Sequence, residues 1–420
     1  MKSSTFVGAV LLSLFLAGCG GSQSSGNAPM PQAAASQVMA GASEARAPTY
    51  PSYNTSPQPA NATGMSNNAV QLGNLMKAGY NIGNTLEAIG GETNWGNPQI
   101  SLQQIQLIKQ SGFNAIRLPT SWDQYADQRT GKISDAWLNR VKQVVQYCVD
   151  NGLYVIVNIH WDGGWLDNNI NSRAQASVNA KQKAYWEQIA TTLRDFDEHL
   201  IFASANEPPV STATEMSILL SYHQTFINAV RSTGGRNAYR VLVVQGPSTD
   251  IDKTYSLMNT MPTDTVPARL MTEVHYYTPY QFCLMTADES WGVQAYYWGA
   301  NFHSTTDPTR NATWGEEAEL DAYFAKMKQK FVDKGIPVVM GEFGAIRRSN
   351  LTGDALTLHL NSRAYFHYYA SKSAKAHGML PFYWDNGVTG VNGFALFNRA
   401  TNTVVDQQMI DALVNGANGL

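Results

Sequence analysis

Residues 152–160 read Gly-Leu-Tyr-Val-Ile-Val-Asn-Ile-His, and residues 241–245 read Val-Leu-Val-Val-Gln. Both are short, nearly continuous apolar runs, which are typical of strands buried on both faces of a parallel sheet. An amphipathic stretch with helical spacing, residues 136–150, precedes the first run and stops at Asn151-Gly152. This order of helix, glycine stop and buried strand predicts an α/β architecture.

The same alternation continues from about Val70 to the end of the chain. Eight strands are predicted, at residues 79–83, 115–118, 154–159, 200–205, 241–245, 270–274, 337–341 and 379–384. Helices are predicted at residues 102–110, 136–150, 174–194, 216–231, 316–333, 363–376 and 406–414. Eight strands separated mostly by helices predict a TIM (β/α)8 barrel as a single domain over residues 69–420. A doubly wound open sheet is the alternative, but no glycine-rich phosphate loop follows the first strand.

The first residues predict export. A basic start is followed by an apolar run over residues 6–17, which is too short for a permanent membrane-spanning helix. The sequence Leu16-Ala17-Gly18-Cys19 resembles the bacterial lipoprotein signal, which implies removal of residues 1–18 and a diacylglyceryl anchor on Cys19. Gly20 resembles the pattern of lipoproteins sent to the outer membrane. An ordinary secretory signal with an incidental cysteine is the alternative.

Residues 19–68 predict a flexible linker. Gly, Ser, Pro, Ala, Asn and Gln dominate this segment, and Glu44 and Arg46 are its only charges. So few apolar side chains cannot offset the entropy lost on ordering the chain. We therefore expect a tether that lets the following domain search for an extended substrate.

Composition narrows the possible functions. The chain has 420 residues, a net charge of −3 and only 15% charged residues, with 10 Trp, 20 Tyr and 15 Phe. A near-neutral balance argues against a nucleic-acid binder. Three cysteines cannot build a disulfide framework, we expect Cys148 and Cys283 to be unpaired, and neither a metal site nor a cofactor is predicted. Many aromatic rings with few charges suit stacking on neutral sugar rings.

Polar side chains recur where the predicted strands end, which is where TIM barrels carry their catalytic groups. They are Arg117, His160, Asn206, Glu207, His275, Tyr277, Glu342 and Trp384. Each one alone has a plain structural explanation, but their gathering at six strand ends favours an active site. Glu207 and Glu342 follow the fourth and seventh strands, so they can converge from opposite sides of the barrel. Glycoside hydrolysis needs two such carboxylates.

The blocks around these carboxylates resemble glycoside hydrolase family 5, the cellulase family A. The two main blocks are Ile-Phe-Ala-Ser-Ala-Asn206-Glu207-Pro208 and Pro-Val-Val-Met-Gly-Glu342-Phe-Gly. Further matching blocks are Gly-Tyr-Asn-Ile-Gly-Asn-Thr-Leu-Glu at 79–87, Ile-Arg-Leu-Pro at 116–119, Val-Asn-Ile-His-Trp at 157–161, His-Tyr-Tyr at 275–277 and Phe-Tyr-Trp at 382–384. The resemblance covers essentially all of residues 70–415.

The resemblance implies a retaining endo-β-1,4-glucanase that cleaves cellulose-like or mixed-linkage glucans by double displacement. It implies that Glu207 is the general acid and base and Glu342 the nucleophile. The negative charge of Glu342 would then raise the pKa of Glu207. The other residues implied to bind substrate or orient the carboxylates are Arg117, His160, Trp161, Asn206, His275, Tyr277 and Trp384.

Alternatives remain open at this stage. An endo-xyloglucanase or a β-mannanase would use the same mechanism, whereas a non-catalytic surface glycan-binding lipoprotein could dispense with the paired carboxylates. A phosphate-handling metabolic barrel is disfavoured by the export signal and the linker. We expect a monomer that is anchored by lipid to the outer membrane and takes a polysaccharide as its substrate.

Tryptophans in the predicted loops are expected to divide between substrate contact and loop packing. The connection from Tyr276 to Thr313 is rich in Tyr, Trp and Asn, and we expect it to build one wall of the cleft. About half of the loop tryptophans should contact substrate; they are Trp95, Trp122, Trp161, Trp165, Trp291, Trp298 and Trp314. Trp137 and Trp186 fall within predicted helices and should be structural.

Overall fold

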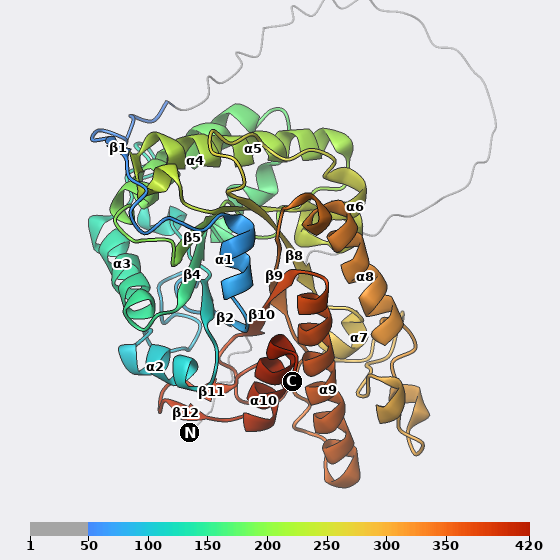
Figure 1. Ribbon diagram of the computed structural model, residues 1–420. Helices are drawn as coiled ribbons and strands as arrows, with labels where there is room; N and C mark the ends of the chain where they lie inside the picture. Colours follow the sequence, from blue (N-terminus) through green and yellow to red (C-terminus); the bar gives the residue numbers. More distant parts are fainter. Residues whose placement is uncertain (1–48) are drawn as a thin grey trace, which may run out of the picture. The chain divides into compact units, whose positions relative to one another are not determined.

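The structure is a computed structural model that describes residues 49–420, and these residues form a closed parallel barrel wrapped by helices (Figure 1). Its strands neighbour one another in the order β10-β2-β3-β4-β5-β7-β8-β9. They are β2 (Gly79–Ile82), β3 (Ala115–Leu118), β4 (Tyr154–Asn158), β5 (Leu200–Ala203), β7 (Leu242–Gln245), β8 (Leu270–Tyr276), β9 (Val338–Phe343) and β10 (Met379–Asp385). The predicted TIM barrel and all eight predicted strands are confirmed.

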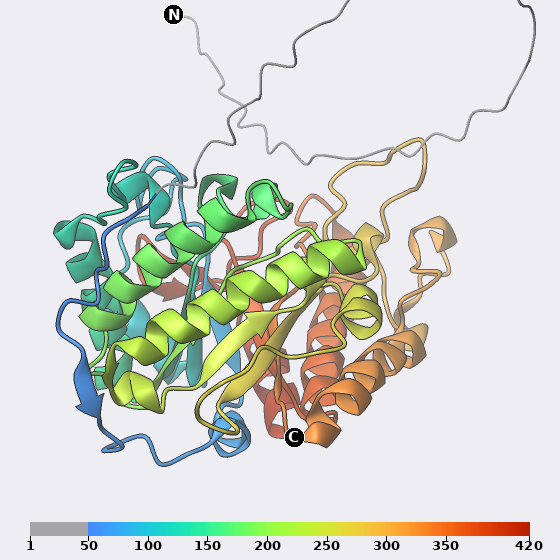
Figure 2. The same cartoon turned by 90° about the horizontal axis from the view of Figure 1, so that it is seen from above.

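The helices follow the predicted alternation with three additions. The main ones are α2 (Leu102–Gln110), α3 (Asp135–Asp150), α4 (Gln175–Thr192), α5 (Ala213–Ser232), α8 (Glu317–Lys330), α9 (Gly353–Ala376) and α10 (Gln407–Asn418). The additions are the short helices α1 (Ala69–Leu75), α6 (Ile251–Leu257) and α7 (Tyr280–Cys283). Helices of one or two turns give too few periodic positions to be read from a sequence. Seen from above, α4 and α5 run side by side along the barrel (Figure 2).

The core has an inner and an outer layer. Val155 and Val157 of β4 pack outward against the helices, while Ile156 belongs to a separate cluster inside the barrel. This arrangement explains why the strand is apolar at almost every position. Leu72 and Met76, from α1 and its C-cap, join the inner cluster, so this short helix closes one end of the barrel (Figure 1).

Part of the predicted linker belongs to the folded domain. The strand β1 (Gln58–Ala60) pairs in parallel with β6 (Gly234–Gly235), directly after α5. The Tyr53 backbone N–H donates to the Glu187 carboxylate of α4 at 2.7 Å. The prediction of a flexible linker through residue 68 is therefore wrong for residues 49–68. Composition misled it because backbone and side-chain hydrogen bonds, rather than apolar side chains, hold much of this segment.

Other expectations for the N-terminus lie beyond the structure. The predicted signal, Cys19 and the linker up to residue 48 fall outside the described residues. No helix within residues 49–420 combines the length and apolar character needed to cross a membrane. Cys148 and Cys283 are both buried and unpaired, as predicted.

Candidate active site

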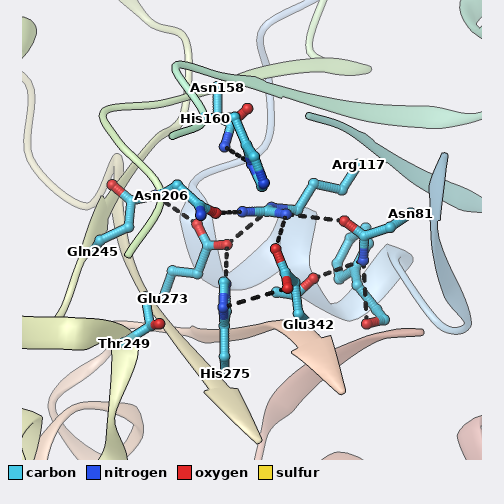
Figure 3. Close-up of polar contacts among 12 residues, drawn as sticks. Asn81, Arg117, Asn158, His160, Asn206, Gln245, Thr249, Glu273, His275 and Glu342 are labelled. Carbon is cyan, nitrogen blue, oxygen red and sulfur yellow. Dashed lines mark hydrogen bonds and ion pairs between the residues drawn. The ribbon is translucent and has the colours of Figure 1, made fainter. Parts of the chain in front are cut away.

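Arg117 is the centre of a polar cluster at the mouth of the barrel (Figure 3). Its Nη1 atom donates to Glu342 at 2.9 Å and to Asn81 at 3.0 Å, and its Nη2 atom donates to Asn206 at 2.8 Å. Its Nε atom lies 3.0 Å from the Glu273 carboxylate as an ion pair. The guanidinium is fully buried, so a single fixed cation orients side chains from several strands.

Glu342 points into this cluster because of an irregularity in β9. Along the ladder with β8, Val274 pairs with Met340 and His275 pairs with Glu342, so Gly341 is an extra residue. Alternation along a strand would otherwise direct Glu342 toward the surrounding helices. The bulge turns it inward, where the Tyr277 hydroxyl donates to it at 3.0 Å.

The bulge residue must be glycine. A Cβ atom on Gly341 would lie 1.9 Å from Oε1 of Glu273, which is far inside van der Waals contact. The Glu273 carboxylate occupies the space that this missing side chain leaves. Gly341 thus places the neighbouring Glu342 and also makes room for a buried acid on the adjacent strand.

Glu207 forms a chain of hydrogen bonds with His275 and Glu273. Nδ1 of His275 lies 2.6 Å from Oε1 of Glu207, and Nε2 lies 3.2 Å from Oε1 of Glu273. The Glu207 side chain is 45% exposed, whereas those of His275 and Glu273 are 4% and 0% exposed. This series of hydrogen bonds therefore runs from the solvent edge of the site, at Glu207, to the inside of the barrel, at Glu273.

His275 carries a positive charge at neutral pH. Burial by itself lowers its pKa, but the charge of Glu342 and the hydrogen bonds to Glu207 and Glu273 outweigh burial and raise the pKa to about 9. A proton on Nδ1 then lies in the short hydrogen bond to Glu207. We treat Glu207 and His275 as one pair that holds one transferable proton below pH 9.

The predicted direction of the Glu207 pKa shift is wrong. Burial raises the pKa of Glu207, but the hydrogen bond and charge of His275, together with the charge of Arg117, lower it further than burial raises it. Burial raises the pKa of Glu342, and the charges of His275 and Arg117 oppose this effect. The prediction failed because it weighed Glu342 against Glu207 and left out the buried imidazolium between them.

Three residues of the cluster escaped sequence analysis: Asn81, Gln245 and Glu273. Gln245 donates to Glu273 at 2.6 Å and accepts from the backbone N–H of Ala205 at 2.8 Å, which ties Glu273 to the segment that carries Glu207. The position of Glu273 in its strand could have pointed to it. Met271 lies inside the barrel, and Glu273 follows it by two residues and therefore lies on the same inner face. A charged residue on the inner face of a buried strand indicates a functional site.

His160 and Trp384 form a second, uncharged part of the site. Their rings are parallel within 5°, with centroids 6.0 Å apart. Burial lowers the pKa of His160 well below its usual value, and the charges of Arg117 and His275 lower it further, so the imidazole is neutral. A Cβ atom on Gly83 would lie 2.6 Å from the Trp384 indole, which makes glycine necessary beneath this ring.

The loop tryptophans differ in burial, with Trp165 intermediate between the buried and the exposed ones, and which of them contact substrate stays a prediction. Trp122 and Trp298 are fully buried and pack the loops, and Trp137 and Trp186 are buried in helices, as predicted. The exposed ones are Trp95, Trp161, Trp291 and Trp314. Trp161 lies outside the hydrogen-bonded cluster, with 47% of its surface exposed. The other predicted site residues come together at the barrel mouth.

The arrangement offers a pair of carboxylates at short range. Within residues 49–420 one group of side chains could together ligate a metal ion, and it consists of Glu207, His275 and Glu342, whose ligand atoms all lie within 4.8 Å of one another. Each of the three already has a hydrogen-bond partner within the cluster. Two carboxylates, a buried imidazolium and an arginine are the chemistry of acid–base and nucleophilic catalysis.

Known proteins with the same organisation match nearly the whole domain. The xyloglucan-specific endo-β-1,4-glucanase of Bacteroides ovatus is 38% identical over 388 residues, covering 88% of this chain and 74% of that protein. Endoglucanase A of Paenibacillus barcinonensis is 39% identical over 376 residues, covering 83% of this chain and 90% of that protein.

Solved structures agree with the sequence relatives. A Bacteroides ovatus xyloglucanase in complex with a heptasaccharide superposes with a TM-score of 0.80 at 35% identity, covering 88% of this chain and 81% of that chain. A family 5 xyloglucanase from Paenibacillus pabuli gives a TM-score of 0.76 at 38% identity, covering 83% and 100%. Residues 77–390 match the family described as Cellulase (glycosyl hydrolase family 5). The chain belongs to this family of glycoside hydrolases.

Proposed function

We propose that the protein is a retaining endo-β-1,4-glucanase in which Glu342 is the nucleophile and Glu207 the general acid and base. One observation carries this proposal: ligand oxygens of Glu207 and Glu342 lie within 4.8 Å of each other. Retaining glycosidases hold their carboxyl groups about 5–5.5 Å apart, whereas inverting enzymes need about 6.5–9.5 Å to fit a water molecule. The spacing supports double displacement with retention.

In the first step Glu342 attacks the anomeric carbon, and the bond from that carbon to the glycosidic oxygen breaks. The leaving oxygen takes the single proton of the Glu207–His275 pair, which passes from Nδ1 of His275 to Glu207 across 2.6 Å and then to the oxygen, so that Glu207 is ionised and His275 neutral when the step ends. Arg117 and Tyr277 hold the two oxygens of Glu342 in the attacking orientation. The product is a glycosyl ester on Glu342.

In the second step water hydrolyses this ester. Glu342 carries no charge while it is esterified. Glu207, which is ionised at this stage, removes a proton from water, and the Glu207–His275 pair thereby regains the proton that it gave up in the first step. The oxygen of water bonds to the anomeric carbon and Glu342 leaves as a carboxylate. Two inversions give net retention.

The remaining predicted residues suit the binding of a sugar at the cleavage point. Oδ1 of Asn206 accepts a hydrogen bond from Arg117, so the Nδ2 group of Asn206 is available to donate to a sugar hydroxyl. Trp384 offers an indole surface beside neutral His160. An apolar ring face and uncharged polar groups complement a pyranose.

Unbranched β-1,4-glucan is the substrate we propose first, and xyloglucan is the second candidate. Relatives of both kinds support this pair, because Endoglucanase A of P. barcinonensis and the xyloglucan-specific enzyme of B. ovatus have almost the same identity to the chain. β-Mannan and a purely binding role have less support, since none of the relatives considered above is named for either.

The test is release of reducing ends from carboxymethylcellulose, mixed-linkage β-glucan, xyloglucan and glucomannan by the protein and by its Glu342→Ala variant. We expect release from the glucans, abolished in the variant, with the newly formed anomer initially β when followed by NMR. Initial formation of the α anomer would contradict the retaining mechanism. No release from any of the four would favour the binding protein.

We also propose that the protein is an exported monomer anchored to the outer membrane through a lipid on Cys19. Support comes from the apolar run and the Leu16-Ala17-Gly18-Cys19 sequence. Mass spectrometry of the N-terminal peptide from a bacterial membrane fraction should find a diacylglyceryl group on Cys19. An unmodified thiol at that position would contradict the anchor, and light scattering of residues 49–420 tests the monomer.

A further inference from the structure

A separate pocket lies in the long connection between β8 and α8. It has a volume of about 240 Å³, and its lining begins at Pro279 and ends at Trp314. Pro279 follows Tyr277 by two residues, so their Cα atoms lie at most about 7 Å apart. Because Tyr277 donates to Glu342, the lining of the pocket begins two residues from a side chain of the catalytic centre.

The lining has the character of a site for a neutral polar ligand. None of its residues is charged. The Gln281 side chain contributes a buried Oε1 atom without a hydrogen-bond partner, although its backbone carbonyl accepts from Ala295 and Arg348. A buried polar atom of this kind indicates a ligand or water partner.

Apolar surface is exposed beside this amide. The lining residues Val293 and Trp314 have 50% and 41% of their surface exposed. Trp291, which does not line the pocket, is 57% exposed on the same connection. The exposed surfaces of Val293 and Trp314 share this lining and mark a binding surface there, whereas Trp291 lies outside it.

Charge argues against an anionic ligand. Arg348 borders the lining, but its guanidinium donates to the backbone carbonyls of Gln281, Met285 and Ala295. The cation on the connection itself is Arg310, and its Nη1 and Nη2 atoms form ion pairs with the two carboxylate oxygens of Asp288 at 2.6 Å and 2.8 Å. Its charge is therefore already compensated. A pyranose remains as the fitting class, because a sugar ring combines an apolar face for Trp314 with hydroxyls that can donate to Gln281.

We infer that this pocket binds a single neutral glycosyl branch of the polysaccharide while the main chain occupies the catalytic cleft. This inference rests on the proposed glucanase function and assigns a specificity determinant to it. The pocket is smaller than the roughly 300–1,000 Å³ typical of drug-sized ligands, so it suits one sugar ring rather than an oligosaccharide. Unbranched glucan has no group to fill it.

The experiment compares branched and unbranched substrates in matched variants. Trp314→Ala and Gln281→Ala alter the pocket, and Trp291→Ala removes an exposed indole from the same connection without touching the lining. We expect kcat/KM on xyloglucan to fall about 5- to 30-fold in the two pocket variants, mainly through KM, because each loses a stacking or hydrogen-bonding contact. Their kcat/KM on mixed-linkage β-glucan should stay within about twofold of the unaltered protein, as should both values for Trp291→Ala.

The outcomes separate this inference from the proposed function. Three results would overturn the branch pocket and leave the glucanase function intact. They are an equal loss of kcat/KM on both substrates in the pocket variants, no loss of kcat/KM on xyloglucan, and an unaltered protein that cleaves only unbranched glucan. Failure of the unaltered protein on every glucan would refute the function itself. As a second measure, calorimetry with the Glu342→Ala protein should find weaker binding of a xylosylated glucan oligosaccharide after Gln281→Ala, and unchanged binding of the unbranched oligosaccharide.

Discussion

Replacing Glu273 by glutamine should move the alkaline limb of the pH–activity profile. Glu273 is fully buried, and its Oε1 atom lies 3.2 Å from Nε2 of His275 and 3.0 Å from Nε of Arg117. Glu273→Gln keeps the size of the side chain and removes its negative charge. The variant therefore isolates the electrostatic contribution of Glu273 to the Glu207–His275 pair.

The expected shift follows from the geometry. The pKa of His275 is raised to about 9, so its proton is present below that pH and is lost as pH rises through it. An opposite charge within about 4–6 Å shifts a pKa by about 1–3 units, and Glu273 lies closer than that. The alkaline limb of kcat/KM should therefore move down from about pH 9 by about one to three pH units.

The assay is the pH dependence of kcat/KM and of kcat on a soluble β-glucan, between pH 5 and 10. At pH 8 we expect kcat to fall about twofold for a shift of one unit and up to about 100-fold for a shift of three units, with KM changed by less than about threefold because Glu273 is buried below the cleft. The loss should shrink toward pH 6, where His275 is protonated again. A merely misfolded variant would lose activity equally at every pH.

Two controls make the result decisive. Glu289→Gln removes the charge of an exposed glutamate and should leave the profile unchanged. Glu273→Asp keeps the charge and should hold the alkaline limb close to its original position, even if the shorter side chain lowers kcat. An unmoved limb in a folded Glu273→Gln protein would refute the assignment of Glu273 as one of the three carboxylates that keep His275 charged.

Three further predictions concern the nucleophile, the bulge and the N-terminal segment. Glu342→Ala should lower kcat by about four orders of magnitude or more with an unchanged circular dichroism spectrum, and near-normal turnover would exclude Glu342 as nucleophile. Gly341→Ala should destabilise the protein by about 1–3 kcal/mol in urea unfolding, because the new Cβ atom meets Glu273 at 1.9 Å; unchanged stability would mean that the strand shifts freely. A chain that begins at residue 69 should have a Tm at least about 2 °C below that of a chain that begins at residue 49, since it loses the β1–β6 pairing. Equal Tm values would restore residues 49–68 to the linker.

The barrel could be predicted because its strands are buried on both faces. Residues 154–159 are apolar at almost every position, and a glycine stop precedes them, so both the type of element and its place in the repeat are readable. The same signal is missing for α1, whose seven residues bury only Ala69, Leu72 and Gly73. Residues 49–68 were misread because the polar side chains and backbone groups that hold them look like those of a linker.

The active site could be predicted only in part, for a geometric reason. Glu207 and Glu342 stand at strand ends beside recognisable blocks, so their positions carry a signal of their own. Glu273 lies within a strand, and its meaning appears only when Arg117, His275 and Gln245 are brought around it from other parts of the chain. The charge of His275 depends on that three-dimensional arrangement, which is why the pKa of Glu207 was predicted in the wrong direction.

The space shared by Gly341 and Glu273 also limits how the family can vary. A side chain at position 341 and a long acidic side chain at position 273 exclude each other, because the Cβ atom of one would overlap the carboxylate of the other. Substitutions at the two positions should therefore occur together, with alanine or serine at 341 accompanied by a shorter residue at 273. Relatives that made this exchange would have to keep the histidine corresponding to His275 charged by other means, or run with an alkaline limit at lower pH.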